Sequence, residues 1–186
     1  MVARPPLRVL IEPMQLADID AVHLIEAASF PVPWPDYAFR QELQTNRLAH
    51  YLVVRVGDEI VAYAGIWMMV DEAHITTFAV LPGWRRRGVG ARLLLALMAS
   101  ARERGARVAT LEVRVSNLPA RMLYARFGFA PVGVRPHYYS DNREDALIMT
   151  SAPLASRQMI ERLARLAEQY GDADLPTRAG QTGRDE

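Results

Sequence analysis

The chain has 186 residues, 51% apolar and 23% charged, which is enough material for one domain with a sizeable core. Its net charge of +1 creates no overall field for nucleic acid, so no direct nucleic-acid binding is expected. The lack of cysteine excludes disulfides, thiolate metal sites and a covalent cysteine intermediate, and the four histidines lack metal-ligand spacing, so no metal is expected.

No apolar run reaches the roughly 18–20 residues that span a membrane, and no signal peptide is visible. We therefore expect a cytoplasmic protein without membrane contact.

Two helices are predicted in the N-terminal part of the chain. Apolar residues with a 3.6-residue period predict a helix over 15–28, and a shorter helix is expected over 36–43 with Asp36 as its N-cap. Between them, three prolines stiffen the loop that carries Phe30 and Trp34.

Strands dominate the middle of the chain. Gly57 and Asp58 mark a hairpin, and Asn117 is placed to cap a helix over 117–127 that Gly128 ends. Runs of apolar and β-branched residues predict strands over 8–12, 50–56, 59–69, 74–80, 107–115, 129–134 and 146–150. A meander of strands followed by alternating strands and helices predicts a mixed α/β (α+β) sheet with helices on both faces.

The strand–turn–helix segment over 78–104 is predicted to bind an anionic group. Arg85, Gly88 and Gly90 fit a pattern of Gln or Arg, two residues, Gly, one residue, then Gly or Ala. Glycines let backbone N–H groups converge, and the helix start adds free donors and a positive dipole end. The chain has no lysine for a P-loop, and Leu93 replaces the third glycine of a Rossmann fingerprint. An ordinary basic connection is the alternative.

Candidates for acid–base chemistry follow this segment. Glu112 alternates with buried-type residues on a strand, so it is either an exposed carboxylate or a general base facing a cleft. Tyr124 is either a core aromatic or a proton donor held by packing.

Short motifs elsewhere add a family resemblance. They are Pro33-Trp34, Asp71-Glu72-Ala73-His74-Ile75, Leu111-Glu112-Val113-Arg114, Ser116-Asn117, Leu123-Tyr124, Phe127-Gly128-Phe129, Tyr138-Tyr139 and Glu144-Asp145-Ala146. With the glycine-rich turn, they make residues 8–150 resemble the RimI group of GCN5-related N-acetyltransferases (GNAT), the ribosomal-protein-alanine N-acetyltransferases. The resemblance implies a GNAT domain over 1–150, with a mixed, mostly antiparallel sheet between helices.

The same resemblance implies the site residues. Glu112 would accept a proton through water, and Tyr124 would donate one to the thiolate of coenzyme A. Acetyl-CoA would be held by Phe78, Ala79, Val80, Arg85, Arg86, Arg87, Gly88, Val89, Gly90, Ala91 and Asn117. Pro35 departs from the family pattern, which often has a serine cap there.

The implied acceptor is a protein N-terminus, typically alanine on a small-subunit ribosomal protein. It would enter between Phe30–Trp34 and Arg135–Tyr139, and Tyr138 and Glu72 would contact it. Two alternatives stay open: an acetyltransferase for lysine side chains or a small amine, and a binding module without catalysis. The presence of both Glu112 and Tyr124 disfavours the binding module.

The resemblance does not cover the end of the chain. Residues 151–170 form a predicted amphipathic helix whose apolar stripe is expected to pack on the domain itself, with a dimer or partner contact as the alternative. The stripe consists of Met159, Ile160, Leu163, Leu166, Ala167 and Tyr170. Residues 171–186 are expected to form a disordered tail.

Overall fold

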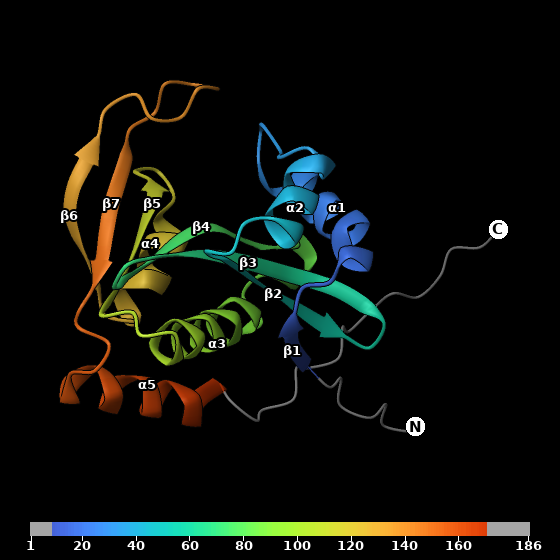
Figure 1. The fold of residues 1–186 in the computed structure, drawn as a ribbon. Coiled ribbons are helices and arrows are strands. Elements are labelled where there is room, and N and C mark those ends of the chain that lie inside the picture. The colour runs from blue at the N-terminus through green and yellow to red at the C-terminus, as the bar shows by residue number, and fades with distance from the viewer. Residues whose placement is uncertain (1–8, 171–186) are drawn as a thin grey trace, which may run out of the picture.

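A seven-stranded sheet forms the centre of the computed structural model, which describes residues 9–170 (Figure 1). Its order is β1-β2-β3-β4-β5-β7-β6. The strands are β1 (Val9–Pro13), β2 (Ala49–Val56), β3 (Glu59–Met69), β4 (Glu72–Val80), β5 (Val108–Arg114), β6 (Phe129–Arg135) and β7 (Ala146–Ser151). Neighbouring strands are antiparallel except for β4 and β5, which confirms the predicted mixed, mostly antiparallel sheet.

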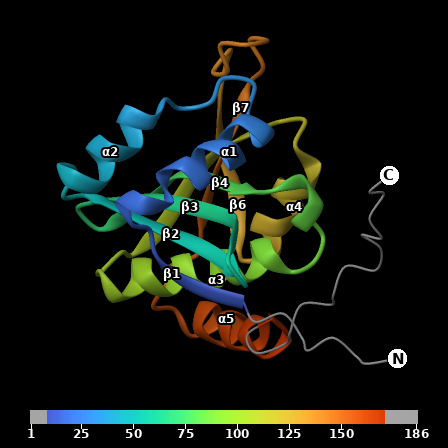
Figure 2. The same ribbon diagram turned by 90° about the vertical axis from the view of Figure 1, so that its right-hand side faces the viewer.

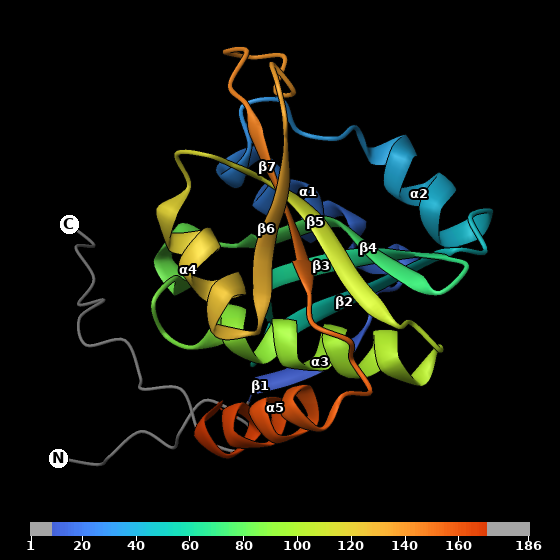
Figure 3. The ribbon, with the colours of Figure 1, turned by 90° about the vertical axis from the view of Figure 1, so that its left-hand side faces the viewer.

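Helices cover both faces of this sheet, as predicted. They are α1 (Ile19–Ser29), α2 (Asp36–Gln44), α3 (Val89–Glu103), α4 (Leu118–Arg126) and α5 (Arg157–Tyr170), with short 3-10 helices η1 (Leu16–Asp18) and η2 (Pro82–Trp84). The α1 and α2 helices lie on one face and α3 on the other, with α5 beneath α3 (Figures 2 and 3). None of the described helices is long and apolar enough to cross a bilayer.

The two faces have separate hydrophobic cores because alternate strand residues point in opposite directions. On β3, Tyr63 packs with Phe39 of α2 on one face, whereas Ala62 and Ala64 belong to the core beneath α3. The same alternation on β5 buries Leu111 and Val113 on the α3 face and leaves Glu112, between them, on the α1 face.

The start of α2 corrects one prediction. Pro35, and not Asp36, is the N-cap, since its backbone (φ −74°, ψ 154°) is extended as an N-cap requires and α2 begins at Asp36. The Asp36 carboxylate contacts Nδ1 of His23 at 3.0 Å instead. The predicted helix over 15–28 likewise begins as η1, and α1 proper starts only at Ile19.

The pairing between β4 and β5 is short, and this creates an opening in the sheet. Only Glu72–Ile75 of β4 pair with Val108–Leu111 of β5. Thr76 then forms a bulge against β3, and β4 continues to Val80 while β5 turns away to pair with β7. Figure 1 shows β5, β6 and β7 running steeply across the direction of β1–β4. The last residues of β4 therefore have no backbone partner on β5, and this separation of the two strands is the opening referred to below.

The C-terminal helix α5 packs on the chain's own domain, which confirms the preferred interpretation. Met159 and Leu166 are buried in the core beneath α3, and Tyr170 packs against its edge. Ile160 and Ala167, which were assigned to the same stripe, are exposed. The predicted tail, 171–186, lies outside the described residues.

Candidate active site

Glu112 lies at the opening between β4 and β5, with its side chain only 9% exposed. One carboxylate oxygen is 2.7 Å from Nε2 of His74 on β4. The other forms an ion pair with Nε of Arg135, the last residue of β6, at 2.9 Å. Glu112 is therefore a mostly buried carboxylate held between an imidazole and a guanidinium group.

Strand alternation explains how these groups meet. Leu111 and Val113 are buried on the α3 face, so Glu112 points to the opposite face. On β4, Ala73 and Ile75 are buried on the α3 face in the same way, which turns His74 toward Glu112. The exposed-carboxylate interpretation of Glu112 does not describe this arrangement.

Arg114, two residues beyond Glu112, fixes the loop between β6 and β7. Its guanidinium donates to Asp141 at 2.7 Å and Glu144 at 3.1 Å, and it lies 3.9 Å from the ring centroid of Tyr139. Hydrogen bonds from Ser116 and Arg114 lower the pKa of Glu144 to about 2, so this carboxylate is charged at any ordinary pH. The loop is thus tied to β5 by charged groups.

Tyr138 and Tyr139 are presented by this loop. Their rings pack edge to face at 5.2 Å, and Tyr138 is 50% exposed. Partial burial and the nearby charge of Glu112 raise the pKa of Tyr138. Tyr138 therefore lies close enough to Glu112 for an electrostatic interaction, and half of its surface remains accessible to a ligand.

Tyr124 of α4 lies on the α3 side of the opening. Its ring packs edge to face on Phe78 of β4 at 6.0 Å and against Phe129 at 5.7 Å. Burial, reinforced by Tyr139, raises the pKa of Tyr124, so the phenol keeps its proton at neutral pH. Tyr124 is a core aromatic, as its pattern predicted, and it is also a protonated hydroxyl beside the end of β4.

The turn between β4 and α3 has left-handed backbone conformations that are typical of anion-binding turns. Arg86 (φ +57°) and Gly88 (φ +82°) are left-handed, and α3 begins at Val89. Successive N–H groups in such a turn and in the first turn of a helix point outward together, where they favour phosphate oxygens. At Gly90, the neighbours are Phe78 and Val80 of β4 and Leu123 of α4, all at ordinary contact distance from a Cβ placed there.

The arginines of this turn have different surroundings. Nε of Arg85 donates to the carbonyl oxygen of Val80 at 2.9 Å and so fixes the turn to the end of β4. The guanidinium of Arg87 lies 4.5 Å from the ring centroid of Trp84, whereas Arg86 is exposed. The residues present therefore suit a phosphate group, with the backbone as its main source of donors. Asn117 caps α4, as its side chain accepts from the backbone N–H of Ala120 at 3.2 Å.

The loop between α1 and α2 is anchored by a carboxylate that sequence reasoning missed. Glu26 of α1 is 2% exposed and accepts hydrogen bonds from the hydroxyl of Tyr63 and from Oγ1 of Thr77 at 3.4 Å. It also accepts one from the backbone N–H of Trp34 at 3.2 Å. Phe30 and Trp34 both pack on the core beneath this loop.

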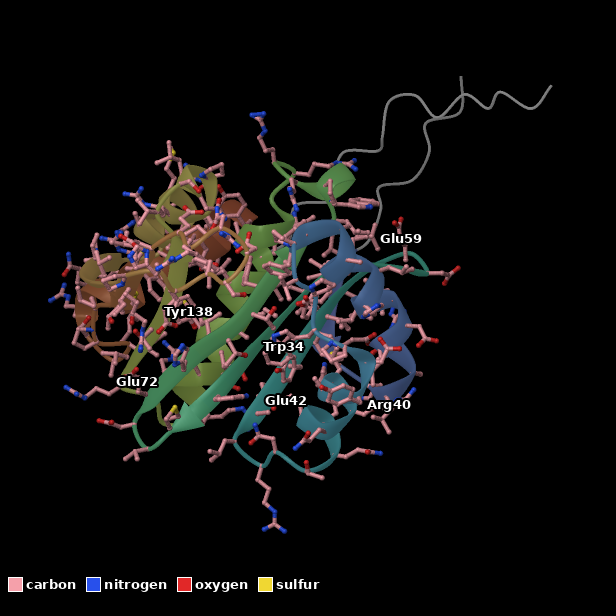
Figure 4. The ribbon with its side chains drawn as sticks, turned by 90° about the horizontal axis from the view of Figure 1, so that it is seen from above. Trp34, Arg40, Glu42, Glu59, Glu72 and Tyr138 are labelled. Carbon is pink, nitrogen blue, oxygen red and sulfur yellow. The ribbon has the colours of Figure 1, made fainter. Side chains whose placement is uncertain are left out.

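Figure 4 places the predicted acceptor residues relative to one another. Trp34 lies on the side of α1 and α2, and Tyr138 lies on the side of β5–β7, with β4 between them. Glu72 lies at the paired start of β4, two residues before His74 and away from the opening after Ile75. The structure thus brings Trp34 and Tyr138 to the two sides of the opening and leaves Glu72 at its closed end.

His74 and Arg135 are the other groups that sequence reasoning did not select as site residues. Both touch Glu112 across strand boundaries, and only the strand register reveals these contacts. No group of three or more possible metal ligands occurs among residues 9–170.

Comparisons with known proteins identify the family of the chain. The family model for the acetyltransferase (GNAT) family matches residues 19–129. A Bacillus subtilis (strain 168) protein, named as a candidate ribosomal protein bS18-alanine N-acetyltransferase, is 47% identical over 136 residues, which is 73% of this chain and 90% of that protein. The Escherichia coli (strain K12) ribosomal protein bS18-alanine N-acetyltransferase is 34% identical over 141 residues, 75% of this chain and 94% of that one.

The fold agrees as well. The crystal structure of the ribosomal-protein-S18-alanine N-acetyltransferase from Escherichia coli matches with a TM-score of 0.73 and 30% identity, covering 80% of this chain and 96% of that chain. The chain therefore belongs to the GNAT family of acetyltransferases, enzymes that take their acetyl group from acetyl-CoA.

Proposed function

We propose that the chain acetylates the α-amino group of a protein N-terminus, and that its acceptor is the N-terminal alanine of a ribosomal protein. The observation that carries this proposal is the opening between β4 and β5, with Glu112 on one face and Tyr124 on the other. The named activity of the Bacillus subtilis and Escherichia coli relatives supports the choice of acceptor.

Acetyl-CoA would lie along the unpaired end of β4, where the backbone of Phe78, Ala79 and Val80 has no partner on β5. Its pyrophosphate would bind the backbone N–H groups of the turn over 86–91. This placement is supported by the left-handed residues Arg86 and Gly88 and by the helix start at Val89.

Glu112 would remove the proton that blocks attack. An α-amino group has a pKa of ~7.7–8.0, so only about a tenth of it is neutral at pH 7. The Glu112 carboxylate, at the mouth of the opening, would take this proton through water. His74, in contact with the same carboxylate at 2.7 Å, would hold it in place and lead the proton outward.

The neutral amine would then attack the thioester carbon, forming the C–N bond and a tetrahedral oxyanion. The C–S bond breaks as the oxyanion collapses, and the leaving thiolate takes the hydroxyl proton of Tyr124. The nitrogen loses its second proton in this step, and that proton restores the Tyr124 hydroxyl through water, while the proton taken by Glu112 leaves to solvent. Burial keeps the Tyr124 hydroxyl protonated at neutral pH, and its packing on Phe78 holds it beside the end of β4, so a proton is available there when the thiolate forms. The net products are the acetylated amine, coenzyme A and one proton.

Tyr138, Phe30 and Trp34 would form the two walls along which the acceptor enters. The ring of Tyr138 is half exposed near Glu112, and Trp34 lies on the other side of β4. Glu72, on the same face as His74, remains a candidate contact for the part of the acceptor that lies further along β4.

A panel of three acceptors tests the proposal, with transfer followed by mass spectrometry. It consists of a peptide with N-terminal alanine, the same peptide with its α-amine blocked, and a peptide with an internal lysine. We expect acetylation of the first peptide alone. Transfer to the lysine peptide would reassign the acceptor to side-chain amines, and acetyl-CoA binding without any transfer would make the chain a binding module.

A further inference from the structure

The C-terminal helix α5 ends against the turn that the proposed function assigns to the pyrophosphate. A Cβ placed on Gly88 would lie 3.5 Å from Cδ1 of Tyr170, so the tyrosine ring borders this turn directly. The ring is only half buried. Met159 and Leu166 fix the helix in the core, so Tyr170 belongs to a docked element.

Three arginines surround a hollow beside Tyr170. Arg126 of α4 and Arg162 and Arg165 of α5 line it, together with Leu166 and Gln169. None of the ion pairs formed among residues 9–170 involves these three guanidinium groups. Three cations around one hollow repel one another unless an anion joins them.

Hydrogen bonds within the protein involve two of the three arginines. Arg162 donates to the carbonyl oxygen of Arg126 at 3.1 Å, which satisfies the end of α4. Arg126 in turn donates to the hydroxyl of Tyr170. Arg165 is exposed, lines the hollow and forms no such contact with the described residues. These hydrogen bonds give no role to the guanidinium group of Arg165.

The chemistry of coenzyme A matches this arrangement. Beyond its pyrophosphate, the molecule carries an adenosine with a 3′-phosphate, a flat base and a dianion within reach of one another. A guanidinium group can donate two parallel hydrogen bonds to the oxygens of one phosphate, and a nucleotide base can stack on an aromatic ring. We propose that the end of α5 is the binding site for the adenosine 3′-phosphate of acetyl-CoA, with Arg165 and Arg162 on the phosphate and Tyr170 against the adenosine. This inference rests on the proposed position of the pyrophosphate at Gly88.

The test compares coenzyme A with 3′-dephospho-coenzyme A, using isothermal titration calorimetry on the full chain. We expect the unaltered chain to bind coenzyme A more tightly, and Arg165→Ala to weaken coenzyme A about fivefold while leaving the dephospho form unchanged. Tyr170→Leu should weaken both ligands equally, by about fivefold, because both carry the adenosine. Arg157→Ala is the matched control, since it removes the same charge from the exposed start of α5, where Arg157 pairs with Glu161.

The ratio of the two affinities decides the outcome. An equal ratio in the unaltered chain and in Arg165→Ala would overturn the inference, and so would an equal loss in the Arg157→Ala control. Binding of neither ligand would overturn the inference and the cofactor site together. If the ratio changes as expected but the alanine peptide is not acetylated, the inference stands and the proposed acceptor fails. Thermal unfolding of each variant separates ligand contacts from loss of α5 packing.

Discussion

Two carboxylates on the same side of the sheet have contrasting surroundings. Glu26, over the β1–β4 half, is 2% exposed and accepts from a phenol, a threonine hydroxyl and a backbone N–H group. Glu112, on the β5–β7 half, is 9% exposed and contacts the imidazole of His74 and the guanidinium of Arg135. Hydrogen bonds from neutral donors inside a core fix a carboxylate as part of the structure. Partners that carry or exchange protons, placed at an opening, suit a carboxylate for chemistry.

The same contrast extends to the neighbourhoods of the two groups. Glu26 joins α1, β3, β4 and the following loop, so its contacts hold the first half of the protein together. Glu112 lies where β4 and β5 separate, and the loop opposite it is tied down by Arg114. We therefore expect the loss of Glu26 to alter mainly stability and the loss of Glu112 to alter mainly turnover.

The largest expected effect is on catalysis in Glu112→Gln. Loss of a general base lowers kcat by about 10²–10⁴-fold, while acetyl-CoA affinity should stay nearly unchanged because the cofactor binds elsewhere. Single-turnover kinetics and calorimetry measure the two quantities. Unchanged turnover at neutral pH would remove Glu112 from its proposed role.

The next effect is on the turn, in Gly88→Val. A branched side chain at φ +82° is strained and disturbs the N–H groups proposed for the phosphates, so acetyl-CoA affinity should fall about tenfold or more. Gly57→Val is the matched control, because Gly57 is also left-handed (φ +60°) but lies in the β2–β3 hairpin with open space around it. If both folded variants bind acetyl-CoA normally, the turn is not the phosphate site.

Glu26→Gln tests the structural side of the comparison. An amide oxygen replaces only part of the acceptor capacity of the carboxylate, so the free energy of unfolding should fall by about 1–3 kcal/mol. Turnover per folded molecule should change far less than in Glu112→Gln. Urea unfolding and initial rates measure both, and a large loss of kcat at full stability would give Glu26 a place in the chemistry.

The smallest effect concerns Glu144→Gln and depends on pH. The pKa of Glu144 is lowered to about 2, from an ordinary value of 4.5, so its charge stabilises the folded state above pH 4.5. This contribution is lost as the pH falls from 4.5 toward 2. The difference in stability between the unaltered chain and the variant should thus be constant at neutral pH and vanish near pH 2. A difference that persists below pH 2 would contradict this origin.

Sequence reasoning was most successful where one local pattern carries the information. The glycine-rich turn, the Asn117 cap and the alternation around Glu112 each lie within a few neighbouring residues, and the structure has the predicted strand–turn–helix, cap and face. The Asp36 cap is the exception among these local predictions, because the conformation of Pro35 decided it.

Contacts between residues far apart in the sequence could not be predicted from local patterns. His74 and Glu112 are 38 residues apart, and their contact depends on the four-pair register between β4 and β5. Glu26 and Thr77, 51 residues apart, meet only once α1 has docked on the sheet. The docking of α5 beside Gly88 also follows from tertiary packing, which an amphipathic stripe alone does not specify.

The short junction between β4 and β5 has a consequence for motion. Amide hydrogens exchange with solvent through local openings, and a sheet opens most easily where the fewest cross-strand bonds must break. Only four residue pairs join two otherwise antiparallel halves, so this seam should exchange faster than the centre of either half. A ligand that contacts both halves at this junction would stabilise the closed state, and its binding should slow amide hydrogen exchange in both strands of the junction.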